Sequence, residues 1–340
     1  MRLDPRLGRA IRLLRTHSTV LTLLTMVVML GIAGLALSEI LKDVKVADIR
    51  AAFDRITPQQ IALSVGLTAV SFIILSFYDV LGLSAIGKPQ PYWRALFGSF
   101  TAYNLSHNLG FAPLTGAAAR WRAYRGTNLD AADIARLVVI AGVTFWLGIF
   151  LLLGLFLVLF PGALRVQDAK MPYVTQAAIG AAVLLGIALY LYACARQTGP
   201  LDILGWTLPV PTLRQALIQF SLAATDIAVA SAALLALLPP DTWHQYPDFL
   251  VAYVVAVVIA LLAHAPGGIG VFETVVLVTL PEVDKPALIS ALILYRLIYY
   301  WGPLFLAIVL LGLNEVRMLR RRGSVQEPDR DDRISTDFTL

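Results

Sequence analysis

Five ionisable side chains fall within long apolar stretches of this 340-residue chain. They are Asp79, Asp226, Glu273, Arg296 and, if its segment enters the membrane, Arg120. A charged side chain at the middle of a membrane span costs about 2.5–3.5 kcal/mol on insertion scales. We therefore expect these residues either to form internal ion pairs or to line a polar cavity. In a cavity, the acids would bind a cationic group and the arginines an anionic one.

Ion pairing is the simpler alternative. Arg120 with Asp79, and Arg296 with Glu273, would fix how their helices pack. The two alternatives overlap, because a resting ion pair can open to accept a zwitterionic substrate.

Two short sequences interrupt apolar segments in the same way. Residues 108–120 and 264–273 each carry a proline, glycines and then a charged residue, and the proline precedes the charge by the same interval in both. A helix broken inside an apolar segment is tolerated only where the freed backbone is buried in protein or lines a polar cavity. A pair of such breaks indicates the binding site of a membrane transporter.

The first break also suggests a phosphate site. Residues 113–116 predict the start of a short helix with Thr115 as its N-cap, and helix N-termini favour phosphate. Arg120 and Arg122 would add positive charge, although an anchor at the membrane interface is the favoured role for Arg122. The second break predicts a similar helix, with Glu273 in its first turn.

Polar residues near the breaks suit the wall of such a cavity. Tyr78 and Asn108 are candidates, although aromatic packing explains the tyrosine equally well. His107 and His264 lie near the two breaks without a third ligand at metal-ligand spacing, so a hydrogen-bonding role is favoured over a metal site. No cofactor is expected, and no motif of a hydrolase, zinc protease or nucleotide-binding loop is present.

Long apolar elements must position these residues. Hydrophobic residues make up 58% of the chain and charged residues 14%, which is typical of polytopic membrane proteins. Segments long enough to span a bilayer lie at about 18–40, 58–87, 131–160, 172–195, 210–238 and 287–314, and the broken segments at about 92–124 and 248–281. A cleaved signal peptide is an alternative for the first span, but its apolar run is long for one.

Recurring residues predict an internal repeat. Asp79 and Asp226 each precede a broken segment, and Asp130 and Asp284 each precede the next span. The expected fold is all-α, with two inverted repeats that each contain a re-entrant broken-helix hairpin, plus one extra N-terminal helix. The repeats cover about 58–196 and 210–317. Inverted units place a binding site near the bilayer midplane.

The distribution of Lys and Arg predicts the topology. Residues 1–17 form a basic cytoplasmic N-terminus, 18–317 the transmembrane domain, and 318–340 a polar cytoplasmic tail that we expect to be disordered. Residues 239–248 contain no Lys or Arg and are placed outside. With this arrangement the two broken hairpins enter the membrane from opposite faces.

The runs 99–124 and 264–273 resemble the flippase domain of the bacterial multiple peptide resistance factors, also called lysylphosphatidylglycerol synthase/flippases. The resemblance covers about 15–320. Members of that family continue into a cytosolic aminoacyltransferase domain, which is absent from this sequence. The resemblance therefore implies a lipid translocator rather than an enzyme. By position, the charged residues implicated in flipping in that family correspond to Asp79, Arg120, Asp226 and Glu273.

The implied function is translocation of an aminoacylated phospholipid, such as lysyl-phosphatidylglycerol, across the bacterial inner membrane, contributing to resistance against cationic antimicrobial peptides. Expected partners are the phospholipid substrate and membrane lipids; a separate synthase protein and a second copy of the chain are further candidates, and no nucleic acid is expected. Alternatives are a secondary transporter of a small polar solute or ion, and a non-catalytic subunit of a lipid-modifying enzyme. A groove that opens sideways favours the lipid, and a sealed vestibule the solute.

Overall fold

The computed structural model describes most of the chain from residue 45 to residue 325. Within this range residues 110–111, 161, 163–164, 167–168, 171, 197–198, 200, 204–205 and 209 are not described, and before it only Leu35 and Ser38 are. The predicted N-terminal segment 1–17, nearly all of the first span and residues 326–340 therefore lie outside the described residues.

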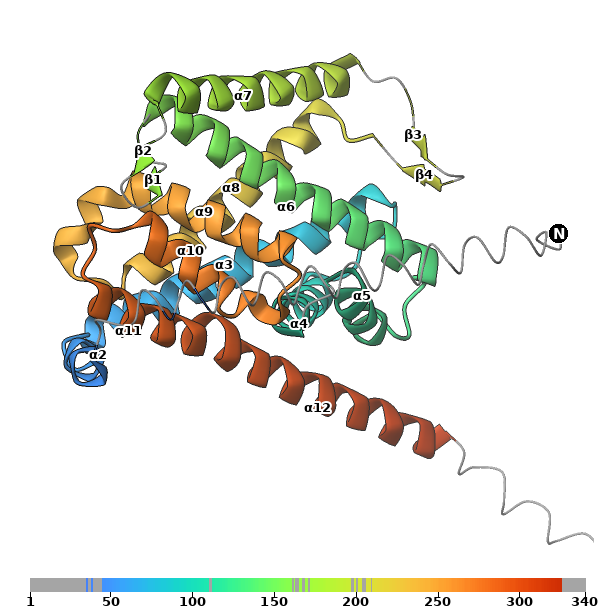
Figure 1. The fold of residues 1–340 in the computed structure, drawn as a ribbon. Helices are drawn as coiled ribbons and strands as arrows, with labels where there is room; N and C mark the ends of the chain where they lie inside the picture. Colours follow the sequence, from blue (N-terminus) through green and yellow to red (C-terminus); the bar gives the residue numbers. More distant parts are fainter. Residues whose placement is uncertain are drawn as a thin grey trace, which may run out of the picture.

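The described part of the chain is built from α-helices, which confirms the predicted all-α membrane fold (Figure 1). The helices are α2 (Val46–Phe53), α3 (Pro58–Ala85), α4 (Tyr92–Leu109), α5 (Ala112–Ala123), α6 (Ala131–Leu159), α7 (Tyr173–Arg196), α8 (Leu213–Leu235), α9 (Tyr246–Leu262), α10 (Val271–Thr279), α11 (Lys285–Tyr295) and α12 (Gly302–Val325). Two 3₁₀ turns, η1 (Pro240–Gln245) and η2 (Pro266–Gly268), and a π-helical turn, η3 (Arg296–Trp301), complete them.

Two very short antiparallel strand pairs lie in connections. β1 (Arg165–Val166) pairs with β2 (Ala169–Lys170) between α6 and α7, and β3 (Leu201–Ile203) pairs with β4 (Trp206–Leu208) between α7 and α8. With so few residues they do not alter the helical architecture.

Six helical segments in the described part are long and apolar enough to cross a membrane. Five match predicted spans, and the sixth joins η1 to α9 at Pro240–Leu262. At 1.5 Å per residue, the 17 residues of α9 extend about 25 Å, less than the roughly 30 Å of a hydrocarbon core. The re-entrant path of this segment therefore stays a prediction.

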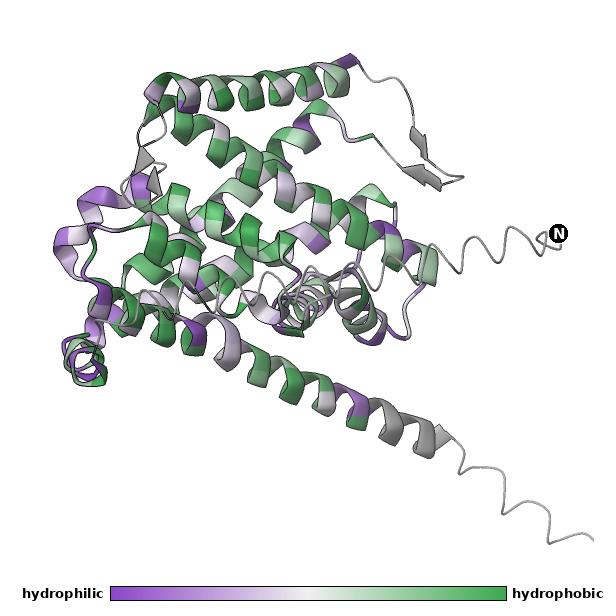
Figure 2. Cartoon of the chain, in the orientation of Figure 1, coloured by the Kyte–Doolittle hydropathy of each residue, from purple (hydrophilic) through white to green (hydrophobic). Residues whose placement is uncertain are grey.

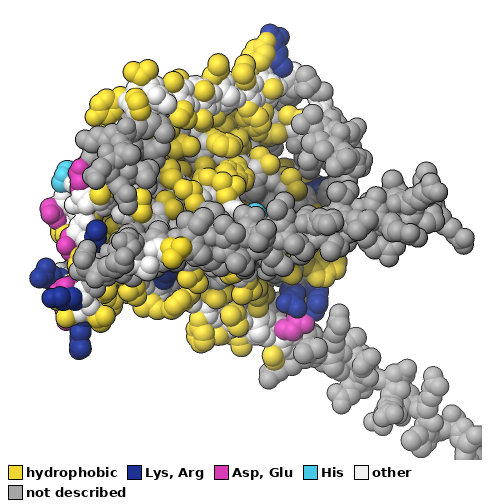
Figure 3. Space-filling model, viewed as in Figure 1, with side chains coloured by type: hydrophobic (Ala, Val, Ile, Leu, Met, Phe, Trp, Pro, Cys, Tyr) yellow, Lys and Arg dark blue, Asp and Glu magenta, His cyan; other side chains and the backbone are white. Residues whose placement is uncertain are grey.

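Hydropathy follows the same arrangement. Hydrophobic residues cover the long helices, while hydrophilic residues gather at the connections (Figure 2). On the face shown in Figure 3, most visible charged side chains lie at two opposite ends, with hydrophobic side chains between them. This is the pattern of a protein whose middle faces lipid and whose ends face water.

The same helix cap begins α3 and α8. The hydroxyl of Thr57 accepts from the Gln60 N–H at 3.3 Å, and the Gln60 side chain accepts from the Thr57 N–H at 2.9 Å. Thr212 and Gln215 repeat this capping box at 3.2 and 2.9 Å. The two helices therefore start from equivalent local structures.

A second local interaction recurs at nearly the same interval. Ser76 lies 3.2 Å from the hydroxyl of Tyr92, and Ser231 lies 3.2 Å from that of Tyr246. At the interval of 155 positions that separates the two caps, Asp226 aligns with Ser71 and not, as the sequence had predicted, with Asp79. The inverted relation between the two halves stays a prediction.

Close packing of small residues holds the halves together. A Cβ at Gly148 of α6 would lie 2.4 Å from the Cβ of Ala223 on α8, so only glycine allows this approach. At the other end of the chain, α12 continues to Val325. Residues 318–325 are therefore helical and do not begin the disordered tail that we expected.

Candidate functional site

The first buried ion pair joins α3 to α5. Asp79 is 0% exposed and Arg120 is 4% exposed. Arg120 donates from Nη2 to Asp79 Oδ1 at 2.7 Å, and from Nε to both carboxylate oxygens at 3.1 and 3.2 Å. Tyr124 donates to Oδ2 at 2.9 Å, and the guanidinium lies 5.1 Å from the centre of the Tyr103 ring. The carboxylate is thus neutralised and hydrogen-bonded, as its burial requires.

The second ion pair joins the π-helical turn η3 to α10. Arg296 donates from Nε to Glu273 Oε1 at 2.6 Å, and from Nη1 to the carbonyl oxygen of Gly267 at 2.5 Å. Glu273 Oε2 accepts from the N–H of Gly270 at 2.8 Å. Glu273 therefore lies in the first turn of its helix, as predicted, and also caps it.

Both pairs are those named in the ion-pair alternative, which the structure confirms. The charges are paired rather than held apart in an open cavity. Arg296 keeps a spare donor, since its Nη2 is buried without a hydrogen-bond partner among the described residues. Its guanidinium also lies 4.5 Å from the Tyr300 ring centre.

The two interrupted segments meet at their breaks. A Cβ placed on Gly267, whose φ is +63°, would lie 3.4 Å from the carbonyl oxygen of Asn108 and 3.7 Å from that of His107. Asn108 also donates to the carbonyl oxygen of Tyr300, in η3, at 3.3 Å. Asn108 therefore connects the first break to the turn that carries Arg296.

Asp226 lies apart from both ion pairs. It is buried on α8, and its Oδ1 accepts from the Ser71 hydroxyl at 2.6 Å. Ser71 is in turn 2.8 Å from the hydroxyl of Tyr299 in η3. Within the part of the chain that the structure describes, no Lys or Arg forms an ion pair with Asp226.

A line of tyrosines connects the two ion pairs through Asp226. The Tyr103 ring, which contacts Arg120, lies edge-on to the Tyr78 ring at 5.9 Å, and the Tyr78 hydroxyl faces Asp226. On the other side the Tyr299 and Tyr300 rings are 5.5 Å apart. Predicted site residues from distant parts of the sequence are thus joined in one network.

Thr115 does not have its predicted role. Helix α5 begins at Ala112, so Thr115 is the fourth residue of the helix and not its N-cap. Pro113 occupies the first turn, where its missing N–H costs nothing and its fixed φ suits the helix. The residues immediately before α5 are outside the described set, so the phosphate-binding N-terminus stays a prediction.

The histidines take different positions. The His107 ring lies 5.7 Å from the Tyr103 ring, whereas His264 is exposed with a φ of +52°. Among the described residues, no group of three or more His, Cys, Asp or Glu side chains could hold a metal ion.

Four contributors to the network are not among the residues expected from the sequence: Ser71, Tyr124, Tyr299 and Tyr300. The matching caps of α3 and α8 could have identified Ser71, because they align it with Asp226. The three tyrosines have no distinguishing local pattern, since an aromatic residue in an apolar segment is ordinary.

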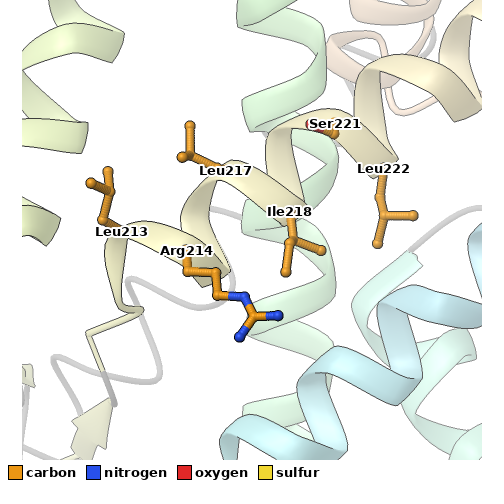
Figure 4. Close-up of a pocket in the computed structure, with 6 residues that line it drawn as sticks. All are labelled: Leu213, Arg214, Leu217, Ile218, Ser221 and Leu222. Carbon is orange, nitrogen blue, oxygen red and sulfur yellow. The ribbon is translucent and has the colours of Figure 1, made fainter.

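A groove of about 600 Å³ opens along α8, away from the ion pairs (Figure 4). Its lining residues are Leu213, Arg214, Leu217, Ile218, Ser221 and Leu222. Arg214, Ile218 and Leu222 point to the same side of the helix. The groove is therefore mainly apolar, with one cation near its end.

Together the helices, the meeting breaks and the buried charges define a multi-pass membrane protein with a polar network inside its bundle. No protein-family model matches the chain. It is 33% identical to the uncharacterized protein slr0712 of Synechocystis sp., over 81% of this chain and 85% of that protein. It is 30% identical to the inner membrane protein YbhN of Escherichia coli, over 76% of this chain and 82% of that protein. The chain belongs to the same family as these two proteins.

A more distant similarity extends to larger enzymes. The phosphatidylglycerol lysyltransferase of Staphylococcus haemolyticus is 24% identical over 71% of this chain, and that of Staphylococcus aureus strain MRSA252 is 23% identical over 81%. The matched regions cover only 28% and 32% of those enzymes.

Proposed function

We propose that this protein translocates a phospholipid, either an aminoacylated phosphatidylglycerol or a related lipid, across the bacterial inner membrane. One support is its similarity to a part of phosphatidylglycerol lysyltransferases, proteins whose name states that they act on phosphatidylglycerol. In this proposal the shared part is a flippase domain, a separate synthase protein supplies the lipid, and both termini are cytoplasmic.

The observation that carries the proposal is that two ion pairs, one buried and one partly buried, involve the helices that follow the two breaks. Each pair couples one acid to one arginine, Asp79 with Arg120 and Glu273 with Arg296. A zwitterionic lipid headgroup can replace both partners at once. Its ammonium group binds the carboxylate, and its phosphate accepts two parallel hydrogen bonds from the planar guanidinium.

Exchange of partners keeps the cost of each charge low. A buried charge without a counter-charge is strongly unfavourable. When the headgroup replaces the protein partner, each charged side chain keeps an opposite charge beside it. Arg296 is prepared for this exchange because its Nη2 is a spare donor.

The groove on α8 supports a lipid over a small solute. Leu213 and Leu217, on its lining, are exposed at the surface of the helix bundle. Arg214 lies among them and suits a lipid phosphate, while the leucines suit an acyl chain.

Translocation is tested with the purified chain in vesicles that contain lysyl-phosphatidylglycerol, phosphatidylglycerol or phosphatidylethanolamine. A membrane-impermeant amine reagent measures the aminolipid in the outer leaflet. A phospholipase added outside the vesicles measures the phosphatidylglycerol in the outer leaflet. We expect Asp79→Asn, Arg120→Gln, Glu273→Gln and Arg296→Gln each to slow translocation at least tenfold.

Glu315→Gln is the matched control, because it breaks an exposed ion pair with Arg125. It should leave the translocation rate unchanged. The proposal is wrong if all four buried-charge variants, folded and at normal levels, translocate every lipid of the panel at the wild-type rate.

A further inference from the structure

Asp226 is the one acid of the network that no described cation neutralises. Its side chain is buried within α8, where that helix packs against α3, α6, α7, α9 and α11. An ionised carboxylate held there would be costly, while the neutral acid would not. A residue in this setting is suited to gaining and losing a proton.

The groups that face Asp226 from the surrounding helices are hydroxyl groups. Asp226 interacts electrostatically with four tyrosines: Tyr78 on α3, Tyr103 on α4, Tyr253 on α9 and Tyr299 in η3. On α11, Tyr295 donates to a backbone carbonyl of α8. The other neighbours present no described charge to it: α6 offers Thr144, which bonds Gln219, and α7 offers Tyr190, whose ring meets Phe220.

The hydrogen bonds can run in either direction. Ser71 has one proton and two oxygen neighbours, Asp226 at 2.6 Å and Tyr299 at 2.8 Å. When the carboxylate is ionised, Tyr299 donates to Ser71 and Ser71 donates to Asp226. When Asp226 carries a proton, it donates to Ser71, and Ser71 donates to Tyr299. Tyr78, buried and without a hydrogen-bond partner of ordinary geometry among the described residues, is the spare donor at Asp226.

The same hydroxyls reach the turn that holds the second ion pair. Tyr299 lies in η3, three residues after Arg296, and η3 also accepts a hydrogen bond from Asn108 of the first break. A π-helical turn is costlier than an α-helical one and often marks a functional site. A change of hydrogen-bond direction at Tyr299 therefore acts on the turn that contacts both breaks.

We propose that Asp226 is a proton-binding site, and that its protonation and release couple lipid translocation to proton movement across the membrane. The inference rests on the proposed function, because it needs two alternating conformations. In one conformation Asp226 takes up a proton from one side of the membrane and becomes a neutral acid, and in the other it releases that proton to the opposite side and becomes a carboxylate. The network Asp226–Ser71–Tyr299 transmits the change to η3.

The first experiment measures proton binding without transport. Infrared difference spectra of the full chain in lipid nanodiscs, recorded across a pH titration, should contain the carbonyl band of a buried carboxylic acid. The band should vanish in Asp226→Asn and persist in Asp48→Asn, which removes an exposed carboxylate on α2. Ser71→Ala, which keeps the acid but removes its hydrogen bond, should shift the band. A band that persists in Asp226→Asn, or one unmoved in Ser71→Ala, overturns the assignment.

The second experiment measures coupling in vesicles with an imposed pH gradient. The wild-type and Asp48→Asn proteins should translocate lysyl-phosphatidylglycerol faster with the gradient in one direction than with its reverse, and Asp226→Asn should lose this difference. Lipid translocation that does not depend on the gradient refutes the coupling and leaves the proposed function standing. A titrating Asp226 band without any lipid translocation refutes the proposed function and leaves the proton site standing.

Discussion

Asp79→Asn removes the charge from a carboxylate that accepts hydrogen bonds from Arg120 and Tyr124. The guanidinium then stays buried, at 4% exposure, without a counter-charge. Breaking a buried ion pair by removing one partner costs about 3–5 kcal/mol. Since about 1.4 kcal/mol corresponds to a factor of ten, the equilibrium constant for folding should decrease by two to more than three powers of ten.

An exposed ion pair of the same protein gives the reference cost against which the buried pair is compared. Arg125 and Glu315 are 2.8 Å apart, and their side chains are 40% and 42% exposed. Water screens this pair, so Glu315→Gln should cost about 0–1 kcal/mol. The two variants remove the same kind of charge, and only burial differs between them.

A triple variant separates stability from function. Asp79→Leu, Arg120→Met and Tyr124→Phe together remove both charges and the hydroxyl that would lose its acceptor. Replacing a buried ion pair by apolar side chains is often neutral or stabilising. We therefore expect the triple variant to regain stability to within about 1 kcal/mol of the wild type and still to fail in lipid translocation.

The assay is denaturant unfolding in lipid nanodiscs, followed by circular dichroism, beside the vesicle assay of translocation. If Asp79→Asn is no more destabilising than Glu315→Gln, the buried-pair reasoning is refuted. If the triple variant translocates lipid normally, this pair only stabilises the fold.

Three further predictions use other parts of the structure. Gly148→Ala should cost about 1–3 kcal/mol in thermal or denaturant unfolding, because its Cβ would overlap the backbone of α8; Gly142→Ala, with no atom within 4 Å, should be neutral or stabilising by up to about 1 kcal/mol. Membrane-impermeant thiol labelling in intact cells should modify Thr242→Cys and not Asn128→Cys. The predicted topology places the connection between α8 and α9 outside and that between α5 and α6 in the cytoplasm; equal labelling contradicts this topology. Arg296→Lys should slow translocation although the charge is kept. Lysine lacks the planar guanidinium that donates to the Glu273 carboxylate and to a backbone carbonyl at the same time; an unchanged rate would contradict a role of the guanidinium in translocation.

The sequence determined the elements and the candidates for chemistry. Long apolar runs predict α3, α6, α7 and α8 because a bilayer requires about 20 apolar residues per span. Proline and glycine predicted the breaks before α5 and α10. The cost of a charge in lipid selected Asp79, Arg120, Asp226, Glu273 and Arg296, and ion pairing among them was one of the two expected alternatives.

Tertiary packing decided how these residues are used. Which acid meets which arginine, and which acid is left without a cation, depends on how α3, α8 and η3 cross. Ser71 and Tyr299 reach Asp226 only through that crossing, and neither carries a signal in its own segment. The start of α5 also shifted, because Pro113 is accommodated inside the first turn and Thr115 follows within the helix. Local composition sets the cost of burying a charge, whereas only the folded arrangement supplies the partner that offsets it.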